Sequence, residues 1–223
     1  MFCFVVIFLL TAATYSRNGI WKSGIDLWTD CVSKSPNKGR PHYNLGSAFA
    51  RQGKYEEAVG HLSEAVKINR DYEDAHFNLG TLFAQQGKYY EASHHFREAL
   101  RINPNRSDVH NNLGFVLIRQ QKYRDALTCL TEALRINPSE ASIHYNLAEA
   151  LLHDGNVDEA ILNYIKALEI KPNFAEARYS LGLAYLKTGH KELALEEHKA
   201  LMTIHPDLAD SLLKETKHLD LNR

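Results

Sequence analysis

The chain has 223 residues, of which 44% are hydrophobic, and this is enough for a packed core, so disorder over most of its length is excluded. The 26 Lys and Arg residues against 27 Asp and Glu residues give a formal net charge of -1, which lacks the basic excess of nucleic-acid-binding proteins. The three cysteines, Cys3, Cys31 and Cys129, are odd in number and widely spaced, which fits neither a disulfide framework nor a structural zinc site.

The chain begins with an apolar segment. Residues 1–16 carry no charged side chain, and Arg17 and Lys22 follow them. A membrane-spanning helix needs about 20 apolar residues, so this run is slightly short, and no basic stretch precedes it as in a signal peptide. Three interpretations stay open: a membrane anchor or the end of a longer membrane protein, a cleaved signal peptide, or a first helix buried on the rest of the fold. We favour membrane association through residues 1–16, on an undetermined side of the membrane; the alternative is a soluble cytoplasmic or periplasmic protein.

One pattern, HYNLGSAFARQGKYEEA at residues 42–58, recurs along the chain at a constant interval. The later copies cover residues 76–92, 110–126, 144–160 and 178–194. Each copy continues into a second amphipathic run that ends near an isoleucine, and in most copies a proline follows. The sequence therefore predicts five two-helix units over residues 39–208, with boundaries 39–72, 73–106, 107–140, 141–174 and 175–208.

These units resemble the tetratricopeptide repeat, a helix-turn-helix unit of about 34 residues. The resemblance implies an all-α fold, a right-handed superhelical solenoid. Small residues recur where two helices must approach closely: Gly46, Gly80, Gly114, Ala148 and Gly182 in the first helices, with Ala58, Ala92, Ala126, Ala160 and Ala194 in the second. Glycine also occupies the turn between the helices in four units, where a left-handed backbone is expected, and Gln121 is the exception.

The repeat pattern extends to both ends of the chain. Residues 17–38 form a junction in which residues 21–36 match the second helix of an incomplete sixth unit. Residues 209–223 contain the apolar pair Leu212 and Leu213 among polar residues, as expected of a capping helix that covers the last repeat.

Asparagine occupies one position of the first helix in four successive repeats: Asn44, Asn78, Asn112 and Asn146. First helices line the concave side of such a solenoid, and a carboxamide both donates and accepts hydrogen bonds. The surrounding NLG motif resembles the repeats of O-linked N-acetylglucosamine transferase, and this resemblance implies an asparagine ladder that holds an extended polypeptide without reading its side chains. Alternatively, the asparagine is a solvated residue common at this position.

Two further columns of residues complete the predicted groove. One holds Tyr43, Phe77, Asn111 and Tyr145, and the aromatic rings of this column suit apolar or backbone contacts. The other holds Arg51, Gln85, Arg119, His153 and Lys187, and its cations make the groove mildly basic and suited to acidic peptides. The predicted partner is thus a protein or peptide.

No catalytic motif is found, so we expect a scaffold that is not an enzyme, without a small-molecule cofactor. The column of His42, His76, His110 and His144 is not expected to bind metal, because packed helices are about 8–10 Å apart, too far for successive residues to share an ion. The column is assigned to packing. An alternative hypothesis is the C-terminal, substrate-presenting repeat domain of a larger membrane glycosyltransferase, because the segment from Trp21 to Trp28 resembles the junction in mannosyltransferase-like proteins that end in such repeats.

Overall fold

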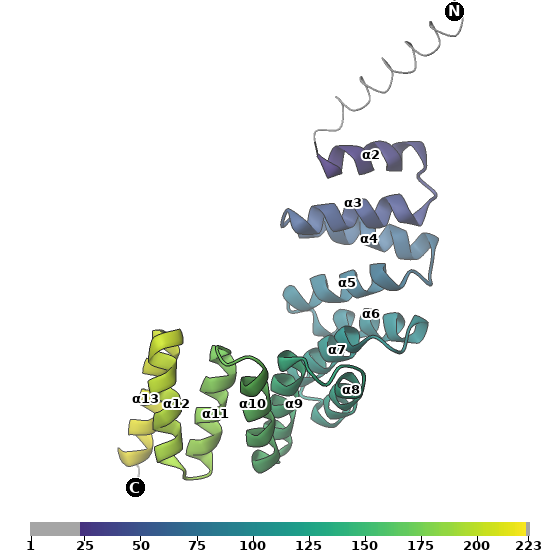
Figure 1. Cartoon of the computed structure of the whole chain (residues 1–223). Coiled ribbons are helices and arrows are strands. Elements are labelled where there is room, and N and C mark those ends of the chain that lie inside the picture. The colour runs from purple at the N-terminus through teal and green to yellow at the C-terminus, as the bar shows by residue number, and fades with distance from the viewer. Residues whose placement is uncertain (1–22, 222–223) are drawn as a thin grey trace, which may run out of the picture. The chain divides into compact units, whose positions relative to one another are not determined.

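The computed structural model describes residues 23–221, and within this range every regular element is an α-helix (Figure 1). The predicted apolar segment, residues 1–16, lies outside the described residues. The helices are α2 (Gly24–Lys34), α3 (Gly39–Arg51), α4 (Tyr55–Ile68), α5 (Glu73–Gln85), α6 (Tyr89–Ile102), α7 (Ser107–Arg119), α8 (Tyr123–Ile136), α9 (Ala141–Asp154), α10 (Val157–Ile170), α11 (Ala175–Lys187), α12 (Lys191–Ile204) and α13 (Pro206–Leu221). The predicted all-α repeat fold is confirmed.

The period of the sequence reappears in the helix boundaries. From α3 to α11 the first helices of the pairs begin at a constant interval, and from α4 to α12 the second helices do the same. A residue with positive φ follows each first helix: Gly53, Gly87, Gly155 and Gly189 in four pairs, and Gln121, with φ of 61°, in the fifth. The left-handed turn is therefore kept even where the glycine is missing.

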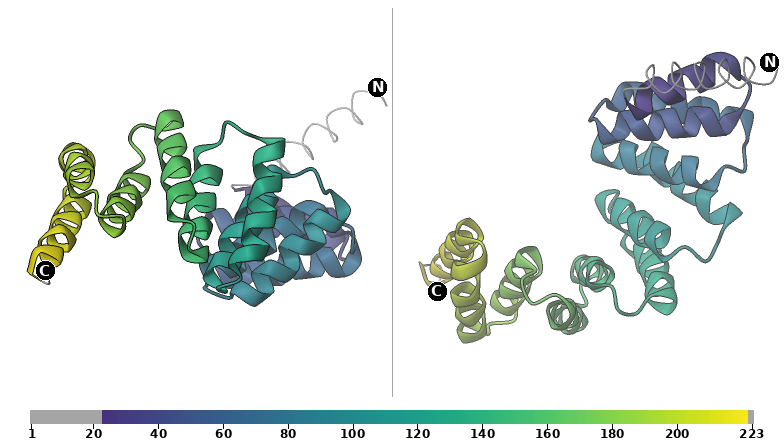
Figure 2. Two further views of the ribbon diagram at one scale, coloured as in Figure 1. Left: turned by 90° about the horizontal axis from the view of Figure 1, so that it is seen from below. Right: turned by 45° about the horizontal axis from the view of Figure 1, so that its top comes forward.

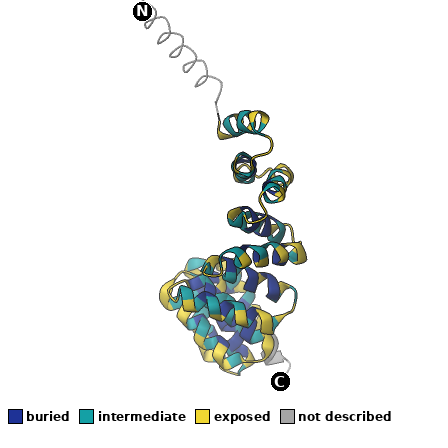
Figure 3. Cartoon of the chain, turned by 90° about the vertical axis from the view of Figure 1, so that its right-hand side faces the viewer, coloured by how far each residue is buried: buried dark blue, intermediate teal, exposed yellow. Residues whose placement is uncertain are grey.

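The chain divides into two compact units, which we call unit 1 (Met1–Ile102) and unit 2 (Asn103–Arg223). The described part of unit 1 contains α2 to α6. Its pairs α3–α4 and α5–α6 are antiparallel, and α2 packs on α3 (Figure 2). Ala58, Leu62 and Leu79 are fully buried at its centre, while the outward faces of the helices are exposed (Figure 3).

Glycine residues, which have no side chain, allow the paired helices of unit 1 to approach closely. A Cβ atom added to Gly46 of α3 would lie 2.8 Å from Cγ of Leu62 in α4. One added to Gly80 of α5 would lie 2.7 Å from the ring of Phe96 in α6. Carbon atoms in contact are normally about 3.5–4.0 Å apart, so any larger residue would separate the pair.

Unit 2 contains α7 to α13 and is closed by α13. Tyr164 and Leu181 are buried in one core cluster of its described residues, and Leu212 is buried in another. Leu212 of α13 lies against Gly182 of α11, where an added Cβ would be 2.5 Å from Cδ2 of the leucine. The capping helix begins at Pro206, slightly before the predicted boundary at 209, because proline needs no hydrogen-bond acceptor in the first turn of a helix.

Among the helices of residues 23–221, none combines the length and the apolar character that crossing a bilayer requires.

Candidate functional site

A pocket of about 330 Å³ opens in unit 1 between the first helices of its two repeats. Its lining residues come from α3 (Ser47, Ala50 and Arg51), the start of α4 (Tyr55) and α5 (Asn78, Thr81, Leu82 and Gln85). Residues three, four and seven positions apart lie on one face of a helix, so α3 and α5 each present one polar stripe to this pocket. Arg51 and Asn78 are two of the predicted groove residues, and the structure brings them to the same pocket.

The polar groups of the pocket can both donate and accept hydrogen bonds. The Asn78 carboxamide donates from Nδ2 to Oγ of Ser47 at 3.2 Å, so its second N–H and its carbonyl oxygen face no partner of their own among the described residues. The Thr81 hydroxyl donates to the carbonyl of Phe77 at 3.0 Å, which leaves its oxygen as an acceptor. The pocket therefore offers both donors and acceptors to a bound molecule.

The charge of the pocket is positive. Arg51 is exposed at the last position of α3, and none of the described residues that line the pocket is a carboxylate. The described residues form no ion pair with its guanidinium, whereas Arg101 of α6 is bonded to Glu98 and to Asp71. Arg51 is therefore available to an anionic group of a ligand.

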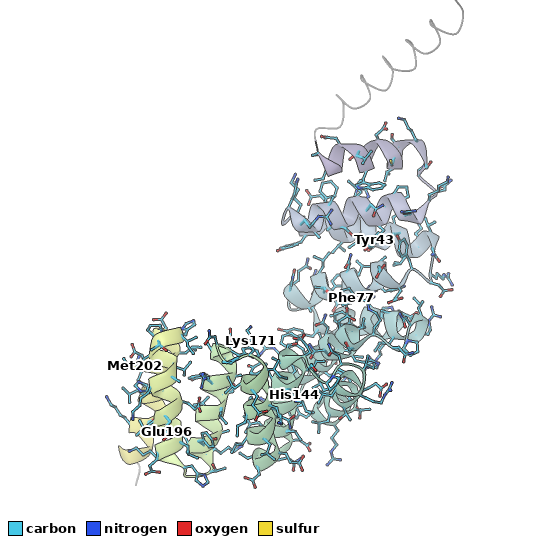
Figure 4. All side chains as sticks on the ribbon, viewed as in Figure 1. Tyr43, Phe77, His144, Lys171, Glu196 and Met202 are labelled. Carbon is cyan, nitrogen blue, oxygen red and sulfur yellow. The ribbon has the colours of Figure 1, made fainter. Side chains whose placement is uncertain are left out.

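The aromatic column behaves differently from the asparagine column. Tyr43 and Phe77, labelled in Figure 4, lie on α3 and α5. Tyr43 packs against Tyr72 with ring centroids 4.9 Å apart, and Phe77 packs against Phe96 with centroids 6.1 Å apart. Both rings are partly buried between helices, and neither lines the pocket. Their place in the structure is in the packing of α3 and α5. Asn44, also half-buried on α3, is likewise outside the pocket lining.

In unit 2 the predicted residues make a short chain of hydrogen bonds. Asn146 of α9 donates from Nδ2 to Oδ1 of Asn111 in α7 at 2.8 Å, and Asn111 donates to Oγ of Ser142 at 3.2 Å. Asn112 is half-buried on α7, and Arg119 and Lys187 are the exposed last residues of α7 and α11. Two carboxamides on neighbouring first helices are thus joined directly.

A buried phenol bonded to a carboxylate lies beside Tyr145, another predicted groove residue of unit 2. The Tyr164 hydroxyl donates to Oε1 of Glu149 at 2.5 Å, and the ring of Tyr145 lies between Tyr164 and Phe174 at 6.1 Å and 5.0 Å. Burial raises the pKa of Tyr145 to about 12, and the nearby Glu149 carboxylate adds to this effect. Burial likewise raises the pKa of Tyr164, so both phenols act only as neutral hydrogen-bonding groups at physiological pH.

Five lining residues were not among the predicted groove residues: Ser47, Ala50, Tyr55, Thr81 and Leu82. The sequence did contain a signal for two of them, because Ser47 lies three positions after Asn44 and Thr81 three positions after Asn78. A second pocket of about 340 Å³ lies in unit 2 beside the turn after α7, where Arg124 approaches Asp154 to 3.8 Å. It contains none of the predicted residues. Within residues 23–221, no three His, Cys, Asp or Glu side chains gather as metal ligands would.

The repeat assignment agrees with known families. The chain matches the TPR repeat model over residues 46–87, 116–155 and 151–189. Further tetratricopeptide repeat models match residues 73–106, 95–128 and 175–207. The chain belongs to the tetratricopeptide-repeat family.

Solved structures with the same fold cover most of the chain. YrrB, described as a TPR protein with an unusual peptide-binding site, is 25% identical with a TM-score of 0.71, over 84% of this chain and 97% of YrrB. MamA from Desulfovibrio magneticus RS-1 is 23% identical with a TM-score of 0.71, over 76% of this chain and 96% of that one. The APC/C complex Cut9–Hcn1 gives 21% identity and a TM-score of 0.72, over 85% of this chain and 38% of that one. None of the curated proteins compared with the chain matches it.

Proposed function

We propose that this chain is a peptide-binding scaffold that holds an extended acidic polypeptide in the unit 1 pocket. A protein-binding TPR scaffold fits the family, and YrrB is a structural relative with a peptide-binding site. The observation that carries the finer proposal is the pocket between α3 and α5, which combines the Asn78 carboxamide with the unpaired Arg51 guanidinium.

The two residues have separate tasks in this proposal. Asn78 bonds to the ligand backbone, in keeping with the asparagine ladder of the O-linked N-acetylglucosamine transferase repeats that the NLG motif resembles. Arg51 attracts an Asp or Glu side chain, and a charged hydrogen bond of this kind contributes about 1.5–3 kcal/mol when it is shielded from water. The scaffold selects acidic peptides but tolerates many sequences, because only one charged group takes part.

The test uses capped decapeptides in fluorescence polarisation with the full chain. Each acidic peptide is paired with a version in which Asn and Gln replace Asp and Glu. We expect the acidic version to bind at least fivefold more tightly, which corresponds to about 1 kcal/mol. Arg51→Gln should remove this difference, whereas Asn78→Ala should weaken both versions.

Arg97→Gln and Asn105→Ala are the matched controls, because both residues are exposed and lie outside the pocket. Neither change should alter binding. Equal affinity for acidic and neutral peptides would remove the role of Arg51, and undiminished binding by the Asn78→Ala variant would remove the role of the carboxamide.

We further propose that residues 1–16 tether this scaffold to a membrane. The support is the uncharged sequence of this segment, followed by Arg17 and Lys22. The full chain should then sediment with membranes and resist extraction by alkaline carbonate, but dissolve in detergent. Release by carbonate alone would exclude an integral anchor.

The alternative role, as the substrate-presenting end of a larger glycosyltransferase, rests on the segment from Trp21 to Trp28. It predicts several hydrophobic segments encoded in frame upstream of Met1. A stop codon and a ribosome-binding region there would favour the tethered scaffold.

A further inference from the structure

One contact between the two helices of a repeat changes in chemistry along the chain. It joins a residue of the first helix to a residue of the second helix at a fixed separation in sequence. The residues at these positions are His42 and His61, His76 and His95, His110 and Cys129, His144 and Asn163, and Arg178 and Glu197. Two histidines face each other in both repeats of unit 1, and the described contacts of unit 2 contain no such pair.

The histidine pairs are built for neutral rings. In the first repeat the Nδ1 atoms of His42 and His61 are 3.2 Å apart, and Nε2 of His42 lies 3.0 Å from the carbonyl of Pro36. A carbonyl only accepts, so Nε2 of His42 carries the proton and its Nδ1 accepts from Nδ1–H of His61. The pair of His76 and His95 repeats this geometry, with distances of 3.0 Å between the Nδ1 atoms and 3.1 Å to the carbonyl of Arg70.

Aromatic rings and cations surround both pairs. Phe49 stacks on His61 at 5.6 Å and Phe83 stacks on His95 at 5.5 Å. The ammonium groups of Lys54 and Lys88 each lie 5.8 Å from the centroid of the adjacent phenylalanine ring. His42 and His76 are themselves buried, so a proton added to either pair would place a positive charge where water is excluded and other cations are near.

The second pair has further charged neighbours on α6. The ring of His94 lies 5.1 Å from that of His95. Among the described residues, Glu98 is the one carboxylate that acts on this pair, and it is bonded to Arg101 at 3.0 Å, which limits its ability to stabilise an imidazolium.

These surroundings oppose protonation in the folded state. Burial lowers the pKa of His95 to about 4, and His76 and His94 add to the effect. Burial also lowers the pKa of His76, as well as that of His61, where His42 contributes. If both rings of a pair were protonated, two N–H groups would face each other and the hydrogen bond would be lost.

Two repeats of unit 2, α9–α10 and α11–α12, accommodate positive charge at the same position. The Arg178 guanidinium donates to Glu197 at 2.8 Å and to the carbonyl of Pro172 at 3.0 Å. His144 faces two acceptors in the same way, the carbonyl of Pro138 and Oδ1 of Asn163, each at 3.2 Å. In the α9–α10 and α11–α12 repeats a first-helix cation therefore faces acceptors on both sides, whereas in unit 1 it would face another histidine. In the α7–α8 repeat, Nε2 of His110 lies 2.9 Å from the carbonyl of Pro104, and its Nδ1 is buried without a hydrogen-bond partner among the described residues.

We propose that the two histidine pairs make unit 1 an acid-sensitive module, in which protonation loosens α3 from α4 and α5 from α6 while the α9–α10 and α11–α12 repeats of unit 2 stay packed. Because the pocket lies on α3 and α5, acidification would also release a bound peptide; this last step rests on the proposed function.

The direction and size of the effect follow from proton linkage. An unfolded histidine has a pKa of about 6.5, so a group with a lower folded pKa contributes its full stability above that value. The stability is lost as pH falls from about 6.5 towards the folded pKa. For a folded pKa of about 4, the folding equilibrium constant decreases about 25-fold between pH 7.5 and pH 5.0. Because His95 is only partly buried, we expect roughly tenfold.

The test is amide hydrogen exchange of the full chain at pH 7.5 and pH 5.0, with labelling times scaled to equal intrinsic exchange. We expect protection in α3–α6 to fall about tenfold more than protection in α9–α12. The double variant His61→Asn, His95→Asn copies the natural pair of His144 and Asn163, and should keep its protection at pH 5.0. Equal losses in the two regions, or an unchanged acid response in the double variant, would overturn the proposal.

Two further variants keep the test decisive. His61→Asn alone should protect α3–α4 at pH 5.0 but not α5–α6, which gives a local result even if the double variant folds poorly. His205→Asn removes an exposed histidine of unit 2 and should leave the acid response intact.

Peptide affinity should decrease at pH 5.0 in the parent and not in the double variant. If no peptide binds at either pH, the proposed function fails while the exchange result still decides the acid response.

Discussion

Replacing Gly114 of α7 by alanine or leucine tests the close packing of the helix pairs. A Cβ atom at this position would lie 2.5 Å from Cγ and 2.7 Å from Cδ2 of Leu130 in α8, about 1 Å less than a normal carbon contact. Leu130 is fully buried, so it cannot turn away into solvent. Either α7 and α8 separate, or Leu130 leaves its preferred rotamer.

The expected cost can be worked out from these opposing effects. Overpacking a well-packed core costs about 1–3 kcal/mol, and alanine regains up to about 1 kcal/mol because it favours the helix more than glycine does. We expect Gly114→Ala to lower the free energy of unfolding by about 1–2 kcal/mol. Gly114→Leu should lower it by about 3 kcal/mol or more, because Leu130 already fills the space that the leucine side chain would need.

Thermal unfolding followed by circular dichroism measures the change. Gly60 of α4 is the matched control, since an added Cβ there meets no atom within 4 Å. Gly60→Ala should raise the melting temperature, in line with a gain of about 0.5–1 kcal/mol. If Gly114→Leu melted at the parent temperature, the assignment of Gly114 to a close helix contact would be wrong.

Three further changes probe the turn, the cap and the groove. Gln121→Gly should stabilise the chain by about 0.5–1 kcal/mol, because glycine adopts the observed φ of 61° without steric strain; an unaltered melting temperature would contradict this. Leu212→Ala should cost about 2–4 kcal/mol and increase hydrogen exchange in α11 and α13, since its side chain fills the space against Gly182. The double change Asn78→Ala, Asn112→Ala should weaken peptide capture at least tenfold by calorimetry without loss of helicity, roughly 1.4 kcal/mol, and unchanged binding would remove the ladder hypothesis.

The sequence predicted the repeat architecture because the same local requirements recur in every repeat. Gly46, Gly80 and Gly114 each mark a place where a second helix approaches, and the structure shows a leucine or phenylalanine side chain against every one of them. Four of the turns were equally readable from their glycines, whereas at Gln121, the exception in the sequence, only the structure shows that the left-handed backbone is kept. A repeated pattern supplies several observations of one local structure.

The pocket was harder to predict because it depends on how neighbouring repeats face each other. The periodicity was enough to predict that Arg51 and Asn78 belong to the groove. The packing of the Tyr43 ring against Tyr72 could not be predicted in this way, because Tyr72 belongs to the loop before the next helix. The histidine column was assigned to packing, yet the opposing histidines were not predicted. The two members of each pair are far apart in sequence, and their contact becomes visible only when the second helix is placed beside the first.

The pair of side chains that joins the first helix of a repeat to its second helix differs from repeat to repeat, and this has a consequence for protein engineering. One chain already contains the histidine–histidine, histidine–asparagine and arginine–glutamate versions of this contact on a shared backbone period. Under the proposed acid response, exchanging two side chains between repeats should move the tolerance to acid from one repeat to another without redesigning a core. The pair chosen for each repeat would then set the pH at which the two helices of that repeat separate, so that different repeats of one chain could open at different pH values.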